Sequence, residues 1–141
     1  MYFPNPTDEE IEAEKAAKAK EYAEIYKPGE YPAQVVHSYD AIAKTSGKPM
    51  FVATLIIHFS EGKTKEKIMY FPQSFPKKIS DLCKAIGQPD LYKTGNIEPH
   101  MVNGQWLTVK MGNVLNTKDQ KFYLDVVELL PQQENSNVEI N

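Results

Sequence analysis

The sequence predicts a mainly β fold with five strands, a helix between the third and fourth strands, and a second helix near the N-terminus. Three observations support this prediction. Most of the chain after Gly29 consists of short apolar runs, several of which alternate with polar residues, as strands do. The segment SFPKKISDLCKAIG instead has apolar residues at helical spacing. The segment TDEEIEAEKAAKAKEYAEIY begins with a helix-capping signal and is rich in alanine.

The N-terminal helix is expected to span residues 8–26. Thr7 and Glu10 have the spacing of a capping box, acidic residues crowd the first turn, and a Pro-Gly pair follows the last turn. The larger apolar residues form only a sparse stripe. We therefore expect residues 1–28 to be a helical extension that lies loosely on the domain. The stripe consists of Ile11, Tyr22, Ile25 and Tyr26.

Turn residues separate the five predicted strands. Residues 44–48 (KTSGK) join the first two strands as a hairpin, and Glu61-Gly62 turns the chain into the third. The helix is expected within residues 74–90, because its apolar side chains repeat every three or four residues before Gly87 and Pro89. A loop follows it. The strands are expected within residues 30–43, 48–60, 64–71, 104–116 and 116–131.

This order of elements is that of an OB-fold, a five-stranded barrel in which strands two and three and the first and last hairpin loops form a binding groove. The sequence therefore predicts a five-stranded OB-fold-like barrel over residues 29–131. An antiparallel sheet with one helix on a face has the same order of elements and stays open as an alternative. The polar residues 132–141 are expected to be a disordered tail.

Length and composition exclude several classes of protein. A chain of 141 residues fits one domain with tails. Its longest apolar run is far shorter than the roughly 20 residues of a membrane helix, and no signal peptide is evident, so we expect a soluble protein that is not exported. The single cysteine cannot form an internal disulfide, and the three histidines are scattered. We expect no metal and no cofactor.

Charge is unevenly distributed along the chain. The net charge is −3, but residues 44–84 carry eight lysines against three acids, whereas both ends are acidic. All the basic residues are lysine. Lysine meets phosphate as a point charge, while bidentate reading of guanine favours arginine. Ordinary surface scatter is one explanation of the basic segment; the other is a nucleic-acid partner that is held by its backbone, without base-specific contacts.

Strand periodicity indicates which side chains share a face. In the second strand, the odd-numbered residues from Phe51 to Phe59 form one apolar face. In the third, Lys65 and Lys67 share a face with Phe71, and Tyr70 lies on the other, so at least one of these two aromatics is expected in the core. In the fourth, Trp106 and Lys110 lie opposite an apolar set. Lysines that follow phosphates and aromatics that stack on bases are typical of single-strand binding. The candidate DNA-binding residues are Lys44, Lys48, Lys63, Lys65, Lys67, Tyr70, Trp106, Lys110, Lys118 and Lys121.

Each candidate has an alternative explanation. A lone tryptophan such as Trp106 commonly packs in a core or at its rim. Lysines on the third strand can protect an exposed sheet edge instead of binding a ligand. Asp119 lies between Lys118 and Lys121 in sequence and offsets part of their charge.

Five segments together resemble a family of small bacteriophage proteins associated with DNA replication and recombination. They are YKPGEYPAQVV, KTSGKPMFVATLII, LCKAIGQPD, GNIEPHMVNGQWLTVKM and KFYLDVVELLP. The family is regarded as OB-fold single-stranded-DNA-binding proteins, many of them long described only as a domain of unknown function. The resemblance covers about residues 26–131 and rests on the order and spacing of the segments. The N-terminal helix and the weakly acidic tail depart from this pattern.

The resemblance implies a non-catalytic, sequence-independent single-stranded-DNA-binding protein that acts in phage DNA replication or recombination. It implies that residues 44–48 form a lysine-tipped hairpin at the edge of a DNA groove. Phage replication or recombination proteins are the implied partners, and the implied location is the cytoplasm of the infected bacterial host. The oligomeric state stays open, with a homo-oligomer as one alternative.

Two other functions stay open. One is a protein-interaction or virion-associated β-barrel that docks a partner through its acidic helix without binding DNA. The other, which the sequence favours less, is a metal-dependent nuclease, since the aspartates are dispersed over separate elements and no catalytic motif is present. The acidic residues 1–30 or the tail could also fold over an empty groove and compete with DNA.

Overall fold

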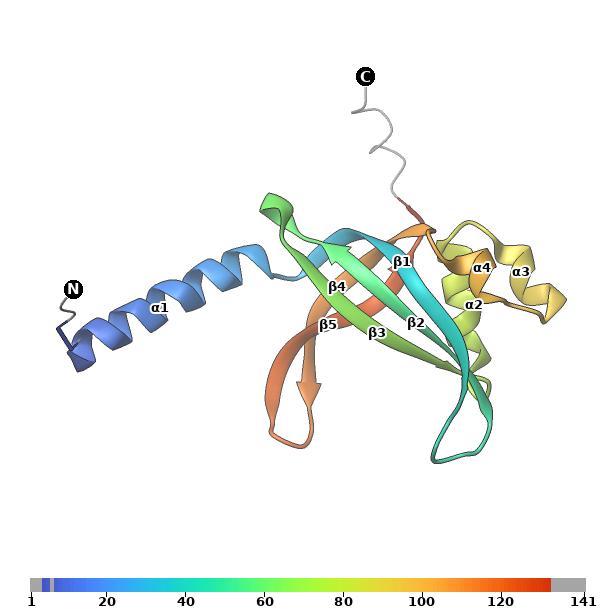
Figure 1. Ribbon diagram of the computed structural model, residues 1–141, viewed down its shortest axis with the longest axis horizontal. Helices are drawn as coiled ribbons and strands as arrows, with labels where there is room; N and C mark the ends of the chain where they lie inside the picture. The colour runs from blue at the N-terminus through green and yellow to red at the C-terminus, as the bar shows by residue number, and fades with distance from the viewer. Residues whose placement is uncertain (1–3, 6, 133–141) are drawn as a thin grey trace, which may run out of the picture.

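The computed structural model describes residues 4, 5 and 7–132 and contains a five-stranded antiparallel sheet with helices before and within it (Figure 1). The predicted disordered tail therefore lies, except for Gln132, outside the described residues. A short 3-10 turn, η1 (Ser60–Gly62), joins the second and third strands. All five predicted strands are confirmed: β1 (Gly29–Ile42), β2 (Pro49–His58), β3 (Thr64–Pro72), β4 (Trp106–Asn116) and β5 (Lys121–Leu130).

The N-terminal helix, α1 (Asp8–Ile25), confirms the prediction to within one residue. The Thr7 hydroxyl accepts a hydrogen bond from the Glu10 N–H at 3.1 Å, and the Glu10 carboxylate accepts one from the Thr7 N–H at 3.3 Å. This is the expected capping box. Among the described residues of α1 only Ile25 is buried, and the helix extends away from the sheet in Figure 1.

Three helices lie between β3 and β4: α2 (Pro76–Ala85), α3 (Pro89–Thr94) and α4 (Pro99–Val102). The sequence predicts the first of them and a loop after it, and the loop prediction is wrong. Each helix begins at a proline, which suits a first helical turn because it lacks the N–H that is unpaired there. Gly95 ends α3 with φ of 73°. Helices this short contain too few turns for a visible apolar period.

The strand order is β3-β2-β1-β4-β5, and each neighbouring pair is antiparallel. The sequence predicts a barrel, whereas this sheet is open: β3 and β5 are its two edges. The register of β1 against β2 shifts between Val35 and His37, a β-bulge that reverses the sides to which later residues of β1 point.

The core lies on one side of the sheet, here called the inner side. Phe51, Ala53, Leu55, Ile57 and Phe59 are all buried there, as their alternation in the sequence predicts. Opposite side chains from β4 and the intervening helices complete the core. The other side of β1, β2 and β3, together with the start of β4 that pairs with β1, is here called the outer face, and no helix covers β1, β2 and β3 on this side in Figure 1. The largest fully buried residues include Leu55, Ile57, Leu82, Leu107 and Val109.

Candidate nucleic-acid interface

Two tyrosines flank a buried valine on the outer face. Val52 pairs with Tyr39 of β1 on one side and with Tyr70 of β3 on the other. Val52 is 1% exposed, whereas Tyr39 is 45% and Tyr70 is 50% exposed. The two tyrosine side chains are thus exposed to solvent, while the valine between them is not. Since Phe71 is only 2% exposed, the structure assigns Phe71 to the core and Tyr70 to the outer face.

The chain's only tryptophan lies farther along the same face. Trp106 pairs with Gln34 of β1 and is 36% exposed. Its ring centroid lies 5.2 Å from that of His58 on β2, with the planes tilted by 34°. Between these aromatics, Thr54 pairs with His37 and Ile68, and Ile68 is 43% exposed. The outer face therefore presents separated aromatic side chains with apolar and uncharged groups between them, except for the exposed Glu66, which lies on this side of β3 opposite Ile56.

The β1–β2 hairpin turn carries Lys44 and Lys48, both exposed. The Gly47 N–H donates to the Ala43 carbonyl at 2.8 Å, and Gly47 has φ of +70°. A side chain at residue 47 would strain this backbone, so glycine is required for the turn and not for close contact with another group, since nothing lies within 4 Å of a Cβ built there. The predicted lysine-tipped hairpin is confirmed; its DNA contact stays a prediction.

The β4–β5 turn carries Lys118 and Lys121, also exposed. Asp119 accepts hydrogen bonds from the Lys121 N–H at 3.0 Å and from the Tyr123 hydroxyl. The second bond raises the pKa of Tyr123, since losing the phenol proton would place two negative groups in contact. Asp119 is thus used to shape the turn. Beside it, Phe122 is 67% exposed.

Both hairpins project from the lower side of the molecule in Figure 1, one on each side of the outer face. They lie at opposite ends of the β1–β4 ladder, because Gly29 pairs with Met111 and Gln34 pairs with Trp106. The twist and coiling of the sheet bring the two turns to the same side.

Lys65 and Lys67 lie on the inner side of β3 instead. The Lys65 Nζ is 4.7 Å from the ring centroid of Tyr26 and 4.9 Å from that of Tyr22, both on or beside the end of α1. The Lys67 Nζ forms an ion pair with Asp125 Oδ1 at 2.9 Å. The structure therefore separates these two lysines from Tyr70 and Trp106. The end of α1 also packs against Lys65 and Phe59 rather than covering the outer face.

The last two candidates lie apart from the hairpin tips. Lys63 follows η1, and its carbonyl accepts the Phe59 N–H at 2.8 Å, so it lies at the end of β2 opposite Lys48. Lys110 is exposed on the same side of β4 as Trp106, as predicted, but its register partners are Glu30 and Glu128. Two carboxylates in register lower its attraction for a phosphate chain.

Exposed apolar residues that sequence reasoning missed, on or beside the candidate interface, include Tyr39, Ile68 and Phe122. Unbroken alternation from Ala33 and Val35 would place Tyr39 on the inner side, and the bulge between Val35 and His37 moves it to the side of Trp106 instead. Ile68 lies two residues from Tyr70 on a strand whose faces the sequence does distinguish, so alternation could have found it. Phe122 follows Lys121 directly, but nothing in the sequence indicates that it lies beyond the core.

The remaining chemistry is sparse. Within the part of the chain that the structure describes, no three His, Cys, Asp or Glu side chains are grouped so that they could hold a metal ion. Cys83 is buried, and this burial raises the pKa of its thiol. Among the described helices, none has the length and apolar character needed to span a membrane.

Comparison with models of known protein families and with curated protein sequences returns no match. The resemblance to small phage proteins therefore stays a prediction.

Proposed function

We propose that this protein binds single-stranded DNA on the outer face of β1, β2 and β3, without base specificity and without catalysis. The observation that carries the proposal is the exposure of Tyr39, Tyr70 and Trp106 on one uncovered side of the sheet. Exposed apolar side chains that gather on one face often mark an interaction site, and bases stack on aromatic rings whatever their sequence.

The arrangement of the strands supports an OB-fold-like barrel that is open on one side. The order β3-β2-β1-β4-β5, with helices between β3 and β4, is that expected of a five-stranded, partly open Greek-key barrel. In that fold, ligands bind across strands two and three and between the first and last hairpin loops. In this protein Tyr70 lies on β3, Tyr39 lies on the neighbouring strand β1, and the two hairpin turns carry four lysines.

Binding would combine stacking with counterion release. Aromatic rings on the outer face would stack on bases, each contributing roughly 1–3 kcal/mol. Lys44 and Lys48 on one turn, with Lys118 and Lys121 on the other, would meet phosphates and displace their counterions. Because lysine has no bidentate geometry for base edges, affinity would depend on salt concentration more than on sequence.

A role in phage DNA replication or recombination, in the cytoplasm of an infected bacterium, follows only from the resemblance. Under it, the protein would coat single-stranded intermediates and contact other replication or recombination proteins.

Fluorescence tests the proposal directly, because Trp106 is the only tryptophan. Titration with a thirty-nucleotide single strand is expected to quench its emission and raise the anisotropy of a labelled strand, with weaker binding at high salt. A duplex of equal length and an RNA strand serve as comparisons. Tyr92→Ala, on α3 and 38% exposed, is the matched aromatic control and is expected to bind as the wild type does. Absence of single-strand binding at low salt would exclude the proposal.

A protein-interaction function is the second candidate, and α1 is the observation that favours it. Over residues 8–24 every residue except Ile11 is exposed, and these residues include seven acids and three lysines. A helix without an apolar face gains little stability from packing against its own domain. Deleting residues 1–27 would abolish partner binding under this function, whereas single-strand binding through the outer face would persist.

A further inference from the structure

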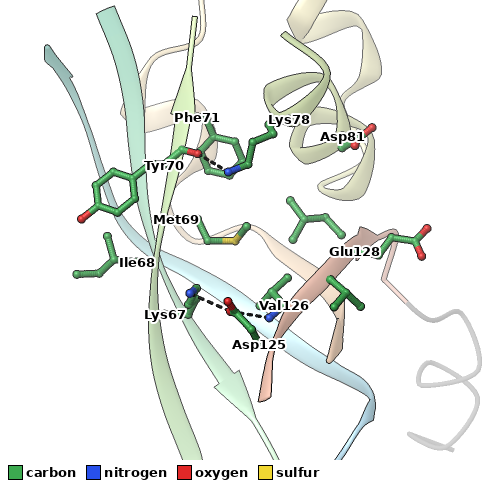
Figure 2. A pocket seen from close by; sticks show the side chains of 12 residues that line it. Lys67, Ile68, Met69, Tyr70, Phe71, Lys78, Asp81, Asp125, Val126 and Glu128 are labelled. Atoms are coloured by element: carbon green, nitrogen blue, oxygen red, sulfur yellow. Dashed lines mark hydrogen bonds and ion pairs between the residues drawn. The ribbon is translucent and has the colours of Figure 1, made fainter. Parts of the chain in front are cut away.

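The two edges of the sheet face one another across a cleft on the inner side (Figure 2). One cavity of about 280 Å³ is lined by residues 67–71 of β3, residues 125–129 of β5 and part of α2. A second cavity of about 260 Å³ reaches the end of α1. Lys67 and Asp125 line both cavities, so their ion pair lies where the two cavities meet, in one gap between β3 and β5.

In this gap, the side chain of Asp125 forms a hydrogen bond with the backbone of β5. Asp125 Oδ1 accepts a hydrogen bond from the Val126 N–H at 2.7 Å and also pairs with Lys67 at 2.9 Å. The two charged side chains are 37% and 40% exposed. Ion pairs with this much solvent access contribute only about 0–1 kcal/mol, so a competing hydrogen-bond donor or acceptor can displace this one.

The side chain of Lys78 likewise forms a hydrogen bond with the backbone of β3. The Lys78 Nζ donates to the Tyr70 carbonyl at 2.9 Å, which shows that this carbonyl points into the gap. At the two ends of β3, the Lys63 carbonyl accepts a hydrogen bond from the Phe59 N–H, and the Gln73 N–H donates to the Pro49 carbonyl. The odd-numbered residues of β3 therefore use their backbone groups to bond β2. Backbone groups alternate in direction along an antiparallel strand. The N–H of Ile68 therefore points into the gap as well.

We propose that this cleft binds an extended peptide segment of a partner protein, which adds as one strand between β3 and β5. Both edges run in the direction of β1, because each is separated from it by one antiparallel strand. A single strand running the other way is antiparallel to both edges. Its backbone replaces the side chains of Lys78 and Asp125 as hydrogen-bond partner, a mode of recognition in which main-chain bonds supply the affinity.

The chemistry of the cleft favours a peptide over a nucleic acid. Asp81, Asp125 and Glu128 line it together with Lys67 and Lys78, so a phosphate chain would meet carboxylates as often as ammonium groups. A peptide backbone is neutral and presents donors and acceptors at strand spacing. In Figure 2, Met69 and Phe71 point toward the cleft, whereas Ile68 and Tyr70 point away from it. The bound segment should therefore have apolar side chains at alternate positions.

An array of random decapeptides tests the proposal on the full-length protein. Peptides with alternating apolar residues are expected to bind, and the strongest are then synthesised with a fluorophore for anisotropy. Ile68→Pro removes the N–H that faces the cleft without removing a β2–β3 hydrogen bond, and is expected to weaken binding at least tenfold. Ile68→Ala is the matched control, because it shortens the same side chain and keeps the N–H. Asp125→Ala frees the Val126 N–H and should strengthen binding up to roughly fivefold.

The outcomes separate this inference from the proposed DNA function. Failure of every peptide to bind, or equal binding by the proline and alanine variants, would overturn it. If the proline variant does not fold, unchanged affinity in Asp125→Ala would overturn it instead. A dimer in sedimentation velocity that either variant alters, or binding that appears only after removal of residues 133–141, would assign the cleft to a second copy or to this chain's own terminus. Single-strand titrations of Asp125→Ala should match the wild type, since Asp125 lies away from the outer face.

Discussion

The two sides of β3 use similar residues for different purposes. On the inner side, Phe71 is 2% exposed and belongs to the core, and Lys65 and Lys67 each contact another part of the chain. On the outer face, Tyr70 is 50% exposed and Ile68 is 43% exposed. Successive residues of β3 thus point alternately to the inner side, where they contact other parts of the chain, and to the exposed outer face.

The difference teaches that exposure and partners, rather than residue type, decide which candidates are available to a ligand. Lys65 and Lys67 lie in the most lysine-rich strand, yet both already have partners within the chain. Lys65 lies over two tyrosine rings, and Lys67 forms an ion pair with a carboxylate. Lys44 and Lys48 lie in a turn whose backbone hydrogen bonds leave both side chains exposed. The lysines most useful for phosphate contact are therefore those of the turns.

Substitution of adjacent residues on β3 should give the largest contrast. Phe71→Ala is expected to lower the free energy of unfolding by about 3–5 kcal/mol, because it leaves a cavity in the core. Tyr70→Ala is expected to change it by about 0.5 kcal/mol or less, as is usual at exposed positions. Urea unfolding of the two variants measures both values. Equal losses would contradict the assignment of the two faces.

Single-strand affinity should show the opposite contrast. Tyr70→Ala and Trp106→Ala are each expected to weaken binding by about 5- to 150-fold, the equivalent of losing one stacked base. Lys67→Ala, on the inner side, should stay within about twofold of the wild type, because screened contacts at a distance contribute little. Anisotropy with the thirty-nucleotide strand measures all three. A stronger effect of Lys67 than of Tyr70 would move the site to the inner side.

Salt dependence should distinguish the turn lysines from those of α2. If Lys44 and Lys48 each meet a phosphate, replacing both with alanine should reduce the slope of log affinity against log salt by about 1.4, at about 0.7 per contact on single strands. The control replaces Lys77 and Lys84 of α2 and should leave the slope unchanged. Titrations at four salt concentrations give each slope. Equal slopes in the two double variants would refute phosphate contact by the β1–β2 turn.

The smallest effect is expected where α1 meets the sheet. Lys65→Met removes the ammonium group that lies over Tyr22 and Tyr26, contacts that contribute about 0.5–1 kcal/mol at exposed sites. Backbone amides in the last turn of α1 should then exchange with solvent deuterium about two- to fivefold faster. Lys63→Met is the control, because this lysine is outside the contact. Unchanged exchange would show that Ile25 and Tyr26 hold the helix without Lys65.

Much of the fold is predictable from local pattern. The capping box at Thr7 and the Pro-Gly pair after α1 act within a few residues, so the sequence alone locates both ends of that helix. The apolar alternation of β2 identifies its buried face, because side chains in a strand point to opposite sides at every step. The helices α3 and α4 escape prediction, since six and four residues do not complete an apolar period.

The candidate site is less predictable, because it depends on contacts between distant segments. The assignment of Tyr39 requires the bulge between Val35 and His37, which only the pairing with β2 reveals. The assignment of Lys65 requires the position of α1, and that of Lys67 requires Asp125 on the far edge of the sheet.

By itself the sequence determined the five strands, the capped N-terminal helix, the buried face of β2 and the lysine-tipped turn at Gly47. These depend on backbone preference, capping and periodicity, which act over a few residues. Only the tertiary structure decided that the sheet stays open between β3 and β5, that Lys65 and Lys67 are occupied, and that Tyr39, Tyr70 and Trp106 share one exposed face. Those outcomes depend on register, twist and long-range packing, which join residues far apart in the chain.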